Sequence, residues 1–209
     1  MADEDLIVPV AQRQVCELDL NSLKPPLDLR QVFGNPHPVS LEIGIGKGLF
    51  LMRSGLAKPQ ENFLGIEYAR KYLNRARERI EKRPIRNVRV VHAEAMSFMQ
   101  DWLIPDSLKA IHLYFPDPWP KKRHHKRRIF NQVFLEACYR LLVTQGDLLI
   151  ATDHADYWAW MCDVLAKQTL FVPSDLLPEP PEDTDGLTNY EIKYQREGRP
   201  IFRTGYRKP

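Results

Sequence analysis

The chain reads Leu41-Glu42-Ile43-Gly44-Ile45-Gly46-Lys47-Gly48 at the end of its first predicted strand. A strand predicted at Val39–Ile43 therefore leads into three alternating glycines, which permit a tight turn into a helix and close approach of a ligand to the backbone. The GxGxG spacing differs from the GxGxxG of dinucleotide-binding turns, and no GK[ST] follows to complete a P-loop. Alone, the turn is equally compatible with a connection that binds nothing.

Apolar runs and helix-length segments alternate along the rest of the chain. Further strands are predicted at Asn62–Ile66, Val88–Val91, Lys109–Phe115 and Asp147–Thr152, and helices at Gly48–Ala57, Ala69–Lys82, Met96–Trp102, Arg127–Leu142 (ended by Gly146) and Ala155–Gln168. This alternation predicts an α/β doubly wound, Rossmann-like fold with a mainly parallel sheet. Pro173–Thr184 reads as an exposed loop, and Tyr190–Arg196 with Pro200–Arg207 as an antiparallel hairpin at the sheet edge.

Length and composition favour one soluble domain. The chain has 209 residues, 27% charged residues and a formal net charge of +3. Its three cysteines are too scattered for a disulfide scaffold or a CxxC metal site, and no apolar run reaches membrane-spanning length. The first residues also lack a signal-peptide pattern, so we expect a cytoplasmic protein.

The small net charge hides strong segregation. Residues 70–89 hold nine Lys or Arg and two acids, and residues 121–128 hold six Lys or Arg and two His. Residues 153–191 hold nine acids and one base. Such asymmetry indicates an anionic partner, although the 70–89 segment is equally compatible with the solvated face of a helix.

Acidic residues stand at the ends of three predicted strands. Glu42 lies in the first strand, Glu67 ends the second, 19 residues beyond Gly48, and Glu94 follows the third. Because ligands of doubly wound folds bind at the carboxyl ends of the strands, these acids are expected to converge with the glycine turn. An acidic rim favours a cationic, adenosine-bearing ligand such as S-adenosylmethionine over a pyrophosphate.

The fourth strand leads into the run FPDPWPKKRHHKRR, residues 115–128. Two prolines restrict the backbone on both sides of Asp117 and hold its carboxylate in place. Trp119 offers a flat face for a base, or is simply buried, and the cations beyond it offer phosphate contacts. The run indicates nucleic-acid binding.

Together these motifs resemble the tRNA (guanine-N7-)-methyltransferase family. The resemblance rests on LEIGIGKG, NFLGIE, the 115–128 run, Ala151-Thr152-Asp153 and Thr188-Asn189-Tyr190-Glu191. It implies a class I methyltransferase domain over residues 39–209, after a partly flexible N-terminal extension, residues 1–38. It also implies methyl transfer from S-adenosylmethionine to N7 of the guanine at position 46 in the tRNA variable loop. A monomer or homodimer with no metal, no membrane association and no obligatory protein partner is expected.

The resemblance also assigns residues. The cofactor-binding positions are Glu42, Gly44, Gly46, Gly48, Glu67, Glu94, Ala95 and Asp117, and Asp117 is also the catalytic position. The substrate-binding positions are Lys121, Asp153, Thr188, Asn189, Tyr190 and Glu191, and candidate RNA contacts are Trp119, Lys122, Arg123, Lys126, Arg127 and Arg128. Glu94 stands where the family pattern has Asp or Asn, and its extra methylene is expected still to reach the adenine amino group.

Guanine N7 carries an in-plane lone pair and no proton, so it can attack a methyl group without a general base. Asp117 then either stabilises the charge that develops on the methylated ring or binds the guanine N1–H and N2–H₂ edge.

Two other hypotheses for the function stay open. An S-adenosylmethionine enzyme with a protein or small-molecule acceptor leaves the basic run without a role, and a non-catalytic tRNA-binding protein leaves the acidic rim unexplained. The absence of HExxH, and the cations around His124 and His125, argue against a metal site.

Overall fold

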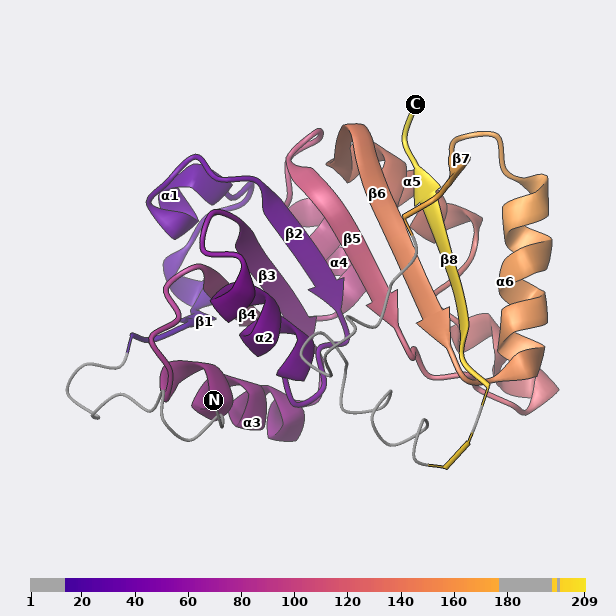
Figure 1. Cartoon of the computed structure of the whole chain (residues 1–209), viewed down its shortest axis with the longest axis horizontal. Coiled ribbons are helices and arrows are strands. Elements are labelled where there is room, and N and C mark those ends of the chain that lie inside the picture. Colours follow the sequence, from indigo (N-terminus) through magenta and orange to yellow (C-terminus); the bar gives the residue numbers. More distant parts are fainter. Residues whose placement is uncertain (1–13, 177–196, 199) are drawn as a thin grey trace.

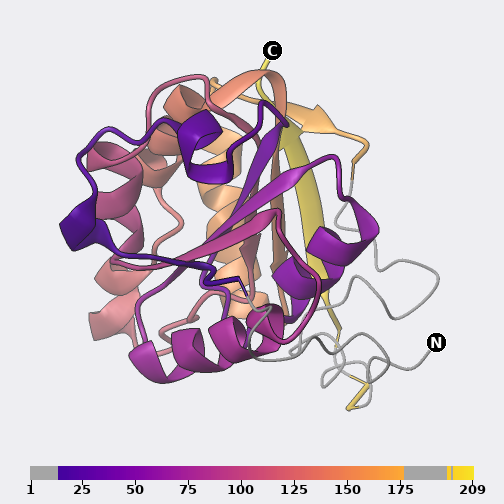
Figure 2. The same cartoon turned by 90° about the vertical axis from the view of Figure 1, so that its left-hand side faces the viewer.

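A twisted eight-stranded sheet forms the centre of the molecule, with helices on both sides (Figures 1 and 2). The structure, a computed structural model, describes residues 14–176, 197–198 and 200–209. The strand order is β1-β4-β3-β2-β5-β6-β8-β7. Strands β1 to β6 pair in parallel, while β8 pairs antiparallel with both β6 and β7. The predicted doubly wound α/β fold is confirmed.

The elements have the following bounds. The strands are β1 Glu17–Leu18, β2 Val39–Ile43, β3 Asn62–Glu67, β4 Val88–His92, β5 Leu108–Tyr114, β6 Leu142–Thr152, β7 Val172–Ser174 and β8 Phe202–Arg207. The helices are α1 Leu29–Phe33, α2 Leu49–Ala57, α3 Arg70–Glu81, α4 Ala95–Asp101, α5 Gln132–Leu141 and α6 Ala155–Lys167, with 3-10 helices η3 Leu20–Ser22 and η4 Lys122–Arg127. No helix in the described part of the chain is long and apolar enough to cross a membrane.

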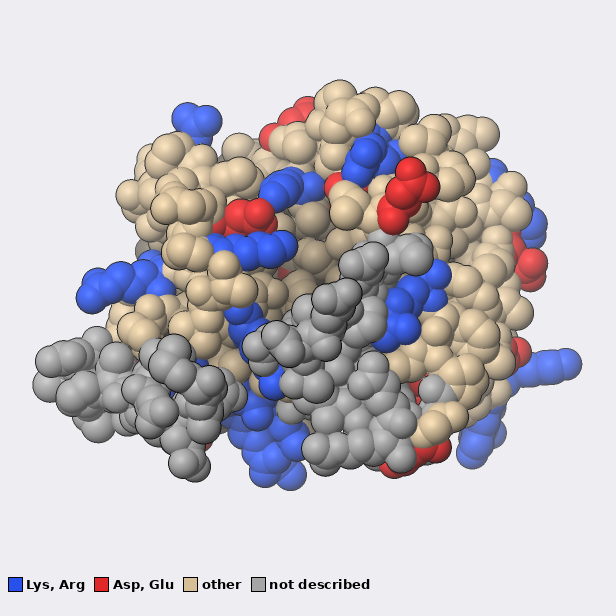
Figure 3. All heavy atoms as spheres, in the orientation of Figure 1, with Lys and Arg blue, Asp and Glu red and all other residues tan. Residues whose placement is uncertain are grey.

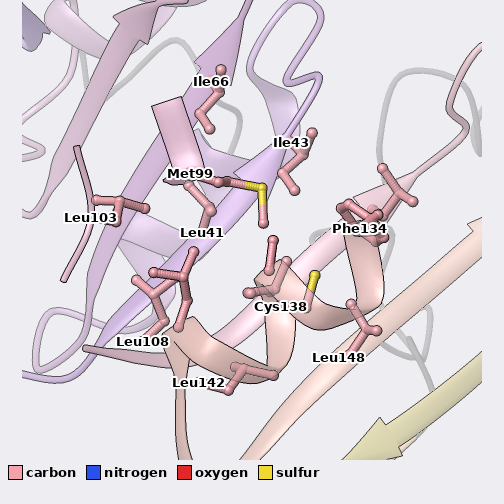
Figure 4. Packing of buried hydrophobic residues seen from close by; sticks show 14 of the residues in the cluster. Leu41, Ile43, Ile66, Met99, Leu103, Leu108, Phe134, Cys138, Leu142 and Leu148 are labelled. Carbon is pink, nitrogen blue, oxygen red and sulfur yellow. The ribbon is translucent and has the colours of Figure 1, made fainter. Parts of the chain in front are cut away.

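Two apolar clusters bury the two faces of the sheet. The larger one joins the sheet to α1, α4, α5 and α6, and its centre includes Leu41, Met99 and Phe134 (Figure 4). The smaller one packs α2 and α3 on the opposite face against β3 and β4. Val39, Leu41 and Ile43 of β2 belong to the larger cluster, and the polar residues Ser40 and Glu42 between them are also buried, so this central strand is buried along its whole length.

The structure corrects two sequence predictions around α5. Helix α5 begins at Gln132, because the Asn131 side chain accepts a hydrogen bond from the Phe134 N–H and caps it, and the preceding cationic run forms η4. Gly146 does not end that helix but lies inside β6, where a Cβ would stand 2.8 Å from the carbonyl oxygen of Val143. The pairing of β5 with β6 is irregular in this region.

The C-terminal part differs from the predicted loop as well. Residues predicted as the start of an exposed loop form β7, which pairs with β8, so the loop prediction is wrong at Pro173 and Ser174. The second predicted hairpin strand corresponds to β8, which lies between β6 and β7. The first predicted hairpin strand, residues 190–196, lies outside the described residues.

Gly48 sets how closely α2 approaches α3. Its φ is +68°, and a Cβ at this position would stand 2.7 Å from the Cβ of Ala76, which is buried on α3. A side chain at position 48 is therefore excluded both by backbone conformation and by space. Gly48, the third glycine of the GxGxG turn, therefore allows α2 to pack closely against α3.

We predict that Gly48→Ala lowers the free energy of unfolding by about 3 kcal/mol, because left-handed strain adds to overpacking. Gly34→Ala is the matched control, since Gly34 has a φ of +72° and nothing within 4 Å of its Cβ position. The control is expected to cost about 1 kcal/mol, from strain alone. Urea denaturation measures both, and equal losses would show that contact with Ala76 has no effect.

Candidate active site

A cavity of about 460 Å³ lies at the carboxyl edge of the central strands. It is lined by residues from the ends of β2, β3, β4 and β5 and from the segments that follow them: Ile43, Gly44, Gly46, Ile66, Glu67, Tyr68, Ala69, Tyr72, Ala93, Glu94, Ala95, Leu113, Tyr114, Phe115, Pro116, Asp117, Trp119, Arg127 and Ile129. The volume suits a cofactor-sized ligand. Three of the predicted acids, two glycines and the tryptophan meet here.

The glycine turn is held against the end of β3. The N–H groups of Gly44 and Ile45 donate to the carbonyl oxygen of Ile66, at 2.9 and 3.2 Å. The Glu67 carboxylate accepts one hydrogen bond from the Gly46 N–H (2.9 Å) and another from the Ala69 N–H (2.8 Å). Glu67 is therefore fixed in orientation at the cavity wall.

Glu94 caps the first turn of α4. Its carboxylate accepts hydrogen bonds from the Met96 N–H (3.1 Å), the Ser97 N–H (2.8 Å) and the Ser97 hydroxyl (3.0 Å). Burial tends to raise the pKa of Glu94, but these hydrogen bonds outweigh it and lower the pKa below its ordinary value. The side chain is thus ionised at neutral pH, and its extra methylene lets it fold back onto the helix.

Glu42 is not among the residues that line the cavity. It is buried, in register with Gly65 and His112, while its neighbour Ile43 lines the cavity. Since side chains alternate between the faces of a strand, and Glu42 is in register with Gly65, Glu42 lies on the same face of the sheet as Glu67. Its contact with a cofactor stays a prediction.

The turn after β5 is strained on both sides of Asp117. Phe115 and Trp119 have φ values of +50° and +44°, which bulky residues rarely adopt. Asp117 is exposed at the cavity wall, and the Phe115 N–H donates to the Ala151 carbonyl oxygen at 2.8 Å. Such outliers are characteristic of functional loops, and they aim Asp117 at the cavity.

Trp119 is half-buried between two basic side chains. The guanidinium of Arg127 lies over its ring, 4.9 Å from the centroid, and His124 meets it edge-on at 5.8 Å. One part of the indole lines the cavity. Stacking of a base on this ring stays a prediction.

Five cations of the basic run are exposed, but Arg128 is buried. The exposed ones are Lys121, Lys122, Arg123, Lys126 and Arg127. The Arg128 guanidinium donates to the Pro118 carbonyl oxygen at 2.9 Å, pairs with Asp156, and lies over the rings of Tyr157 and Trp160. The sequence predicted Arg128 as an RNA contact. Because the side chain is buried, it instead supports the turn that carries Asp117.

Asp153 is not among the residues that line the cavity. Asp153 is half-buried just after β6. The Thr188–Glu191 segment lies outside the described residues. Within the described ranges, no group of three or more His, Cys, Asp or Glu side chains could hold a metal ion.

Comparison with known proteins identifies the family. Residues 36–204 match a family model described as "Putative methyltransferase". The tRNA (guanine-N(7)-)-methyltransferase of Geobacter metallireducens is 36% identical, over 91% of this chain and 92% of its own length. That of Bordetella pertussis is 38% identical, over 85% of this chain and 70% of its own length. The chain belongs to the tRNA (guanine-N(7)-)-methyltransferase family.

Solved structures show the same fold at low sequence identity. The 16S rRNA methyltransferase KamB superposes with a TM-score of 0.64 at 15% identity, covering 94% of this chain and 99% of KamB. The aminoglycoside resistance methyltransferase NpmB1 gives a TM-score of 0.55 at 14% identity, over 87% and 92%. These likenesses support a class I methyltransferase fold for this member of the tRNA (guanine-N(7)-)-methyltransferase family.

Two tyrosines at the cavity of this family member were not predicted from the sequence. Tyr68 and Tyr72 both line it, and their exposed fractions are 74% and 39%. Tyr68 follows Glu67 directly, and Tyr72 lies one helical turn further on. A search of the residues just after each strand end would have included Tyr68.

We predict that Arg128→Ala lowers the free energy of unfolding by about 2 to 3 kcal/mol, because it leaves the Pro118 carbonyl oxygen without its donor and removes cation–π contacts. Arg127→Ala is the control and is expected to change stability by less than about 0.5 kcal/mol. Chemical denaturation measures both. An Arg128→Ala protein of native stability with weakened tRNA binding would restore Arg128 as an RNA contact.

Proposed function

We propose that this chain transfers a methyl group from S-adenosylmethionine to N7 of the guanine at position 46 in the tRNA variable loop. The observation that carries the proposal is a single cavity with carboxylates on one wall and Asp117, Trp119 and a cation on the other. It is supported by membership of the family. We also propose a cytoplasmic monomer or homodimer without a protein partner, with residues 39–209 as the catalytic domain and residues 1–38 as its extension.

The cavity fits an adenosine-bearing cation. Glu67 keeps lone pairs on both oxygens for ribose hydroxyls after accepting its two backbone hydrogen bonds. Nothing lies within 4 Å of the position that a Cβ of Gly44 would occupy, so the turn leaves open space at the cavity wall. Glu94 and Ala95 border the cavity on the β4 side, where we place the adenine.

S-adenosylmethionine supplies, when bound, a methyl group on a positively charged sulfur. The protein's task is then to orient N7 for in-line attack and to exclude competing acceptors. Trp119 would stack on the base, and the exposed cations from Lys121 to Arg127 would bind the flanking phosphates. Asp117, at the wall between them, would bind the guanine edge or stabilise the positive charge that arrives on the purine.

We predict that Asp117→Asn lowers kcat for methyl transfer at least about 100-fold if the carboxylate stabilises charge, with an unchanged fold and unchanged tRNA affinity. If the carboxylate instead binds the guanine edge, KM for tRNA rises. Asp101→Asn, at the end of α4, is the control. Transfer from labelled S-adenosylmethionine to unmodified tRNA, with nucleosides identified by mass spectrometry, measures both. Full activity of Asp117→Asn would contradict a catalytic role.

A second prediction concerns the basic run. Replacing Lys121, Arg123 and Arg127 by Gln is expected to weaken tRNA binding and to lower the slope of log affinity against log salt by about 2 to 3, about 0.7 to 0.9 for each lost phosphate contact. S-adenosylmethionine affinity, measured by calorimetry, is expected to change little. An unchanged salt slope would exclude this run from the RNA-binding surface.

A further inference from the structure

Helix α3 carries a cationic face that the proposed mechanism does not use. Its buried side, Leu73, Ala76 and Ile80, packs in the smaller apolar cluster. The opposite side carries Lys71, Arg75, Glu78 and Lys82, spaced so that they share one face of the helix. That face holds three cations and one acid.

The other cations of α3 serve the protein itself. Arg77 donates to Glu17 at 3.0 Å and lies 3.9 Å from Glu81, and Arg70 also pairs with Glu17 on the edge strand β1. Arg79 donates to the Lys47 carbonyl oxygen at 3.0 Å and so supports the glycine turn. The acids near α3 therefore neutralise one flank of the helix, and the excess positive charge is left on the outer face.

This face is continuous with the mouth of the cavity. Ala69 precedes α3 and lines the cavity, as do Tyr68 and Tyr72. Tyr68 is the more exposed and stacks on His92, with ring centroids 6.3 Å apart. Figure 3 shows Lys and Arg side chains gathered at the lower edge of the molecule, where α3 lies in Figure 1.

We propose that the outer face of α3, with Tyr68 at its pocket end, is a second RNA-binding surface. It would bind the phosphates of the tRNA strand on one side of the target nucleotide, while the Lys121–Arg127 run binds the other side. At 1.5 Å per residue the helix is about 18 Å long, enough to follow several nucleotides. Aromatic faces beside cations are the arrangement that binds single-stranded nucleic acid.

The inference rests on the proposed function and adds to it the path of the RNA. Both cationic segments contribute residues to the same cavity, Tyr72 from α3 and Arg127 from η4, so they border its mouth together. RNA carries a charge at every nucleotide and can therefore satisfy both segments at once. A small anion would contact only one of the two cationic segments.

The test replaces Lys71, Arg75 and Lys82 by Gln in the full-length chain. We expect tRNA affinity to fall about tenfold or more and the salt slope to fall by about 2 to 3. KM for tRNA should rise while kcat at saturating tRNA and S-adenosylmethionine affinity stay unchanged. The control replaces Lys24, Lys58 and Lys109, exposed cations outside α3 and the cavity wall, and removes the same charge.

The outcomes separate this inference from the proposed function. If the wild-type chain methylates guanine N7 but the α3 variant binds tRNA with unchanged affinity and salt slope, the inference is wrong and the function stands. An equal loss in the control would also overturn it, because the effect would then come from net charge alone. A wild-type chain that binds tRNA but leaves N7 unmodified would contradict the proposed function instead.

Substitutions at Tyr68 test the proposed RNA-binding surface independently of the cations. Tyr68→Ala is expected to raise KM for tRNA about tenfold, and Tyr68→Phe, which keeps the ring, to restore it. A Tyr68→Ala protein whose main defect is in S-adenosylmethionine affinity would show that the ring serves the cofactor and not the RNA, and would remove it from the proposed surface.

Discussion

Two hydrogen bonds to the carboxylate of Glu67 hold the candidate active site together. One comes from the glycine turn and the other from the residue that precedes α3. A buried carboxylate makes strong bonds to N–H groups, so the end of β3, the turn after β2 and the start of α3 form one rigid unit. Everything that lines this half of the cavity takes its position from that unit.

The same arrangement keeps negative charge at the cavity without leaving it uncompensated. Glu67 and Glu94 both accept hydrogen bonds from backbone N–H groups, which fix the orientation of each carboxylate. The two acids thus present fixed charge to a cationic ligand without requiring cations beside them. Cations are then free to lie further out, where RNA would approach, and a near-neutral net charge of +3 results from two opposed regions.

The sequence predicted the fold well because apolar runs identify strands that are buried on both faces. It also located the cavity, since the carboxyl ends of parallel strands share one edge. The sequence prediction was wrong where the local structure depends on a single side chain. Glu42 shares a sheet face with Glu67, yet its side chain is buried and does not line the cavity. Helix α5 begins later than the sequence predicts, because the Asn131 side chain caps it and the cations before Asn131 form η4.

The period of the 3-10 helix explains the different environments within the basic run. In such a helix, residues three apart lie on the same side. His125 and Arg128 accordingly both contact Trp160 on α6, and His124 and Arg127 both contact Trp119 at the cavity. The third side, Arg123 and Lys126, faces solvent. A run that reads as uniform charge therefore has an inner side that packs against α6, a side that contacts Trp119, and an outer side that is exposed to solvent. Composition alone cannot distinguish these sides, because the period depends on the backbone that the run adopts.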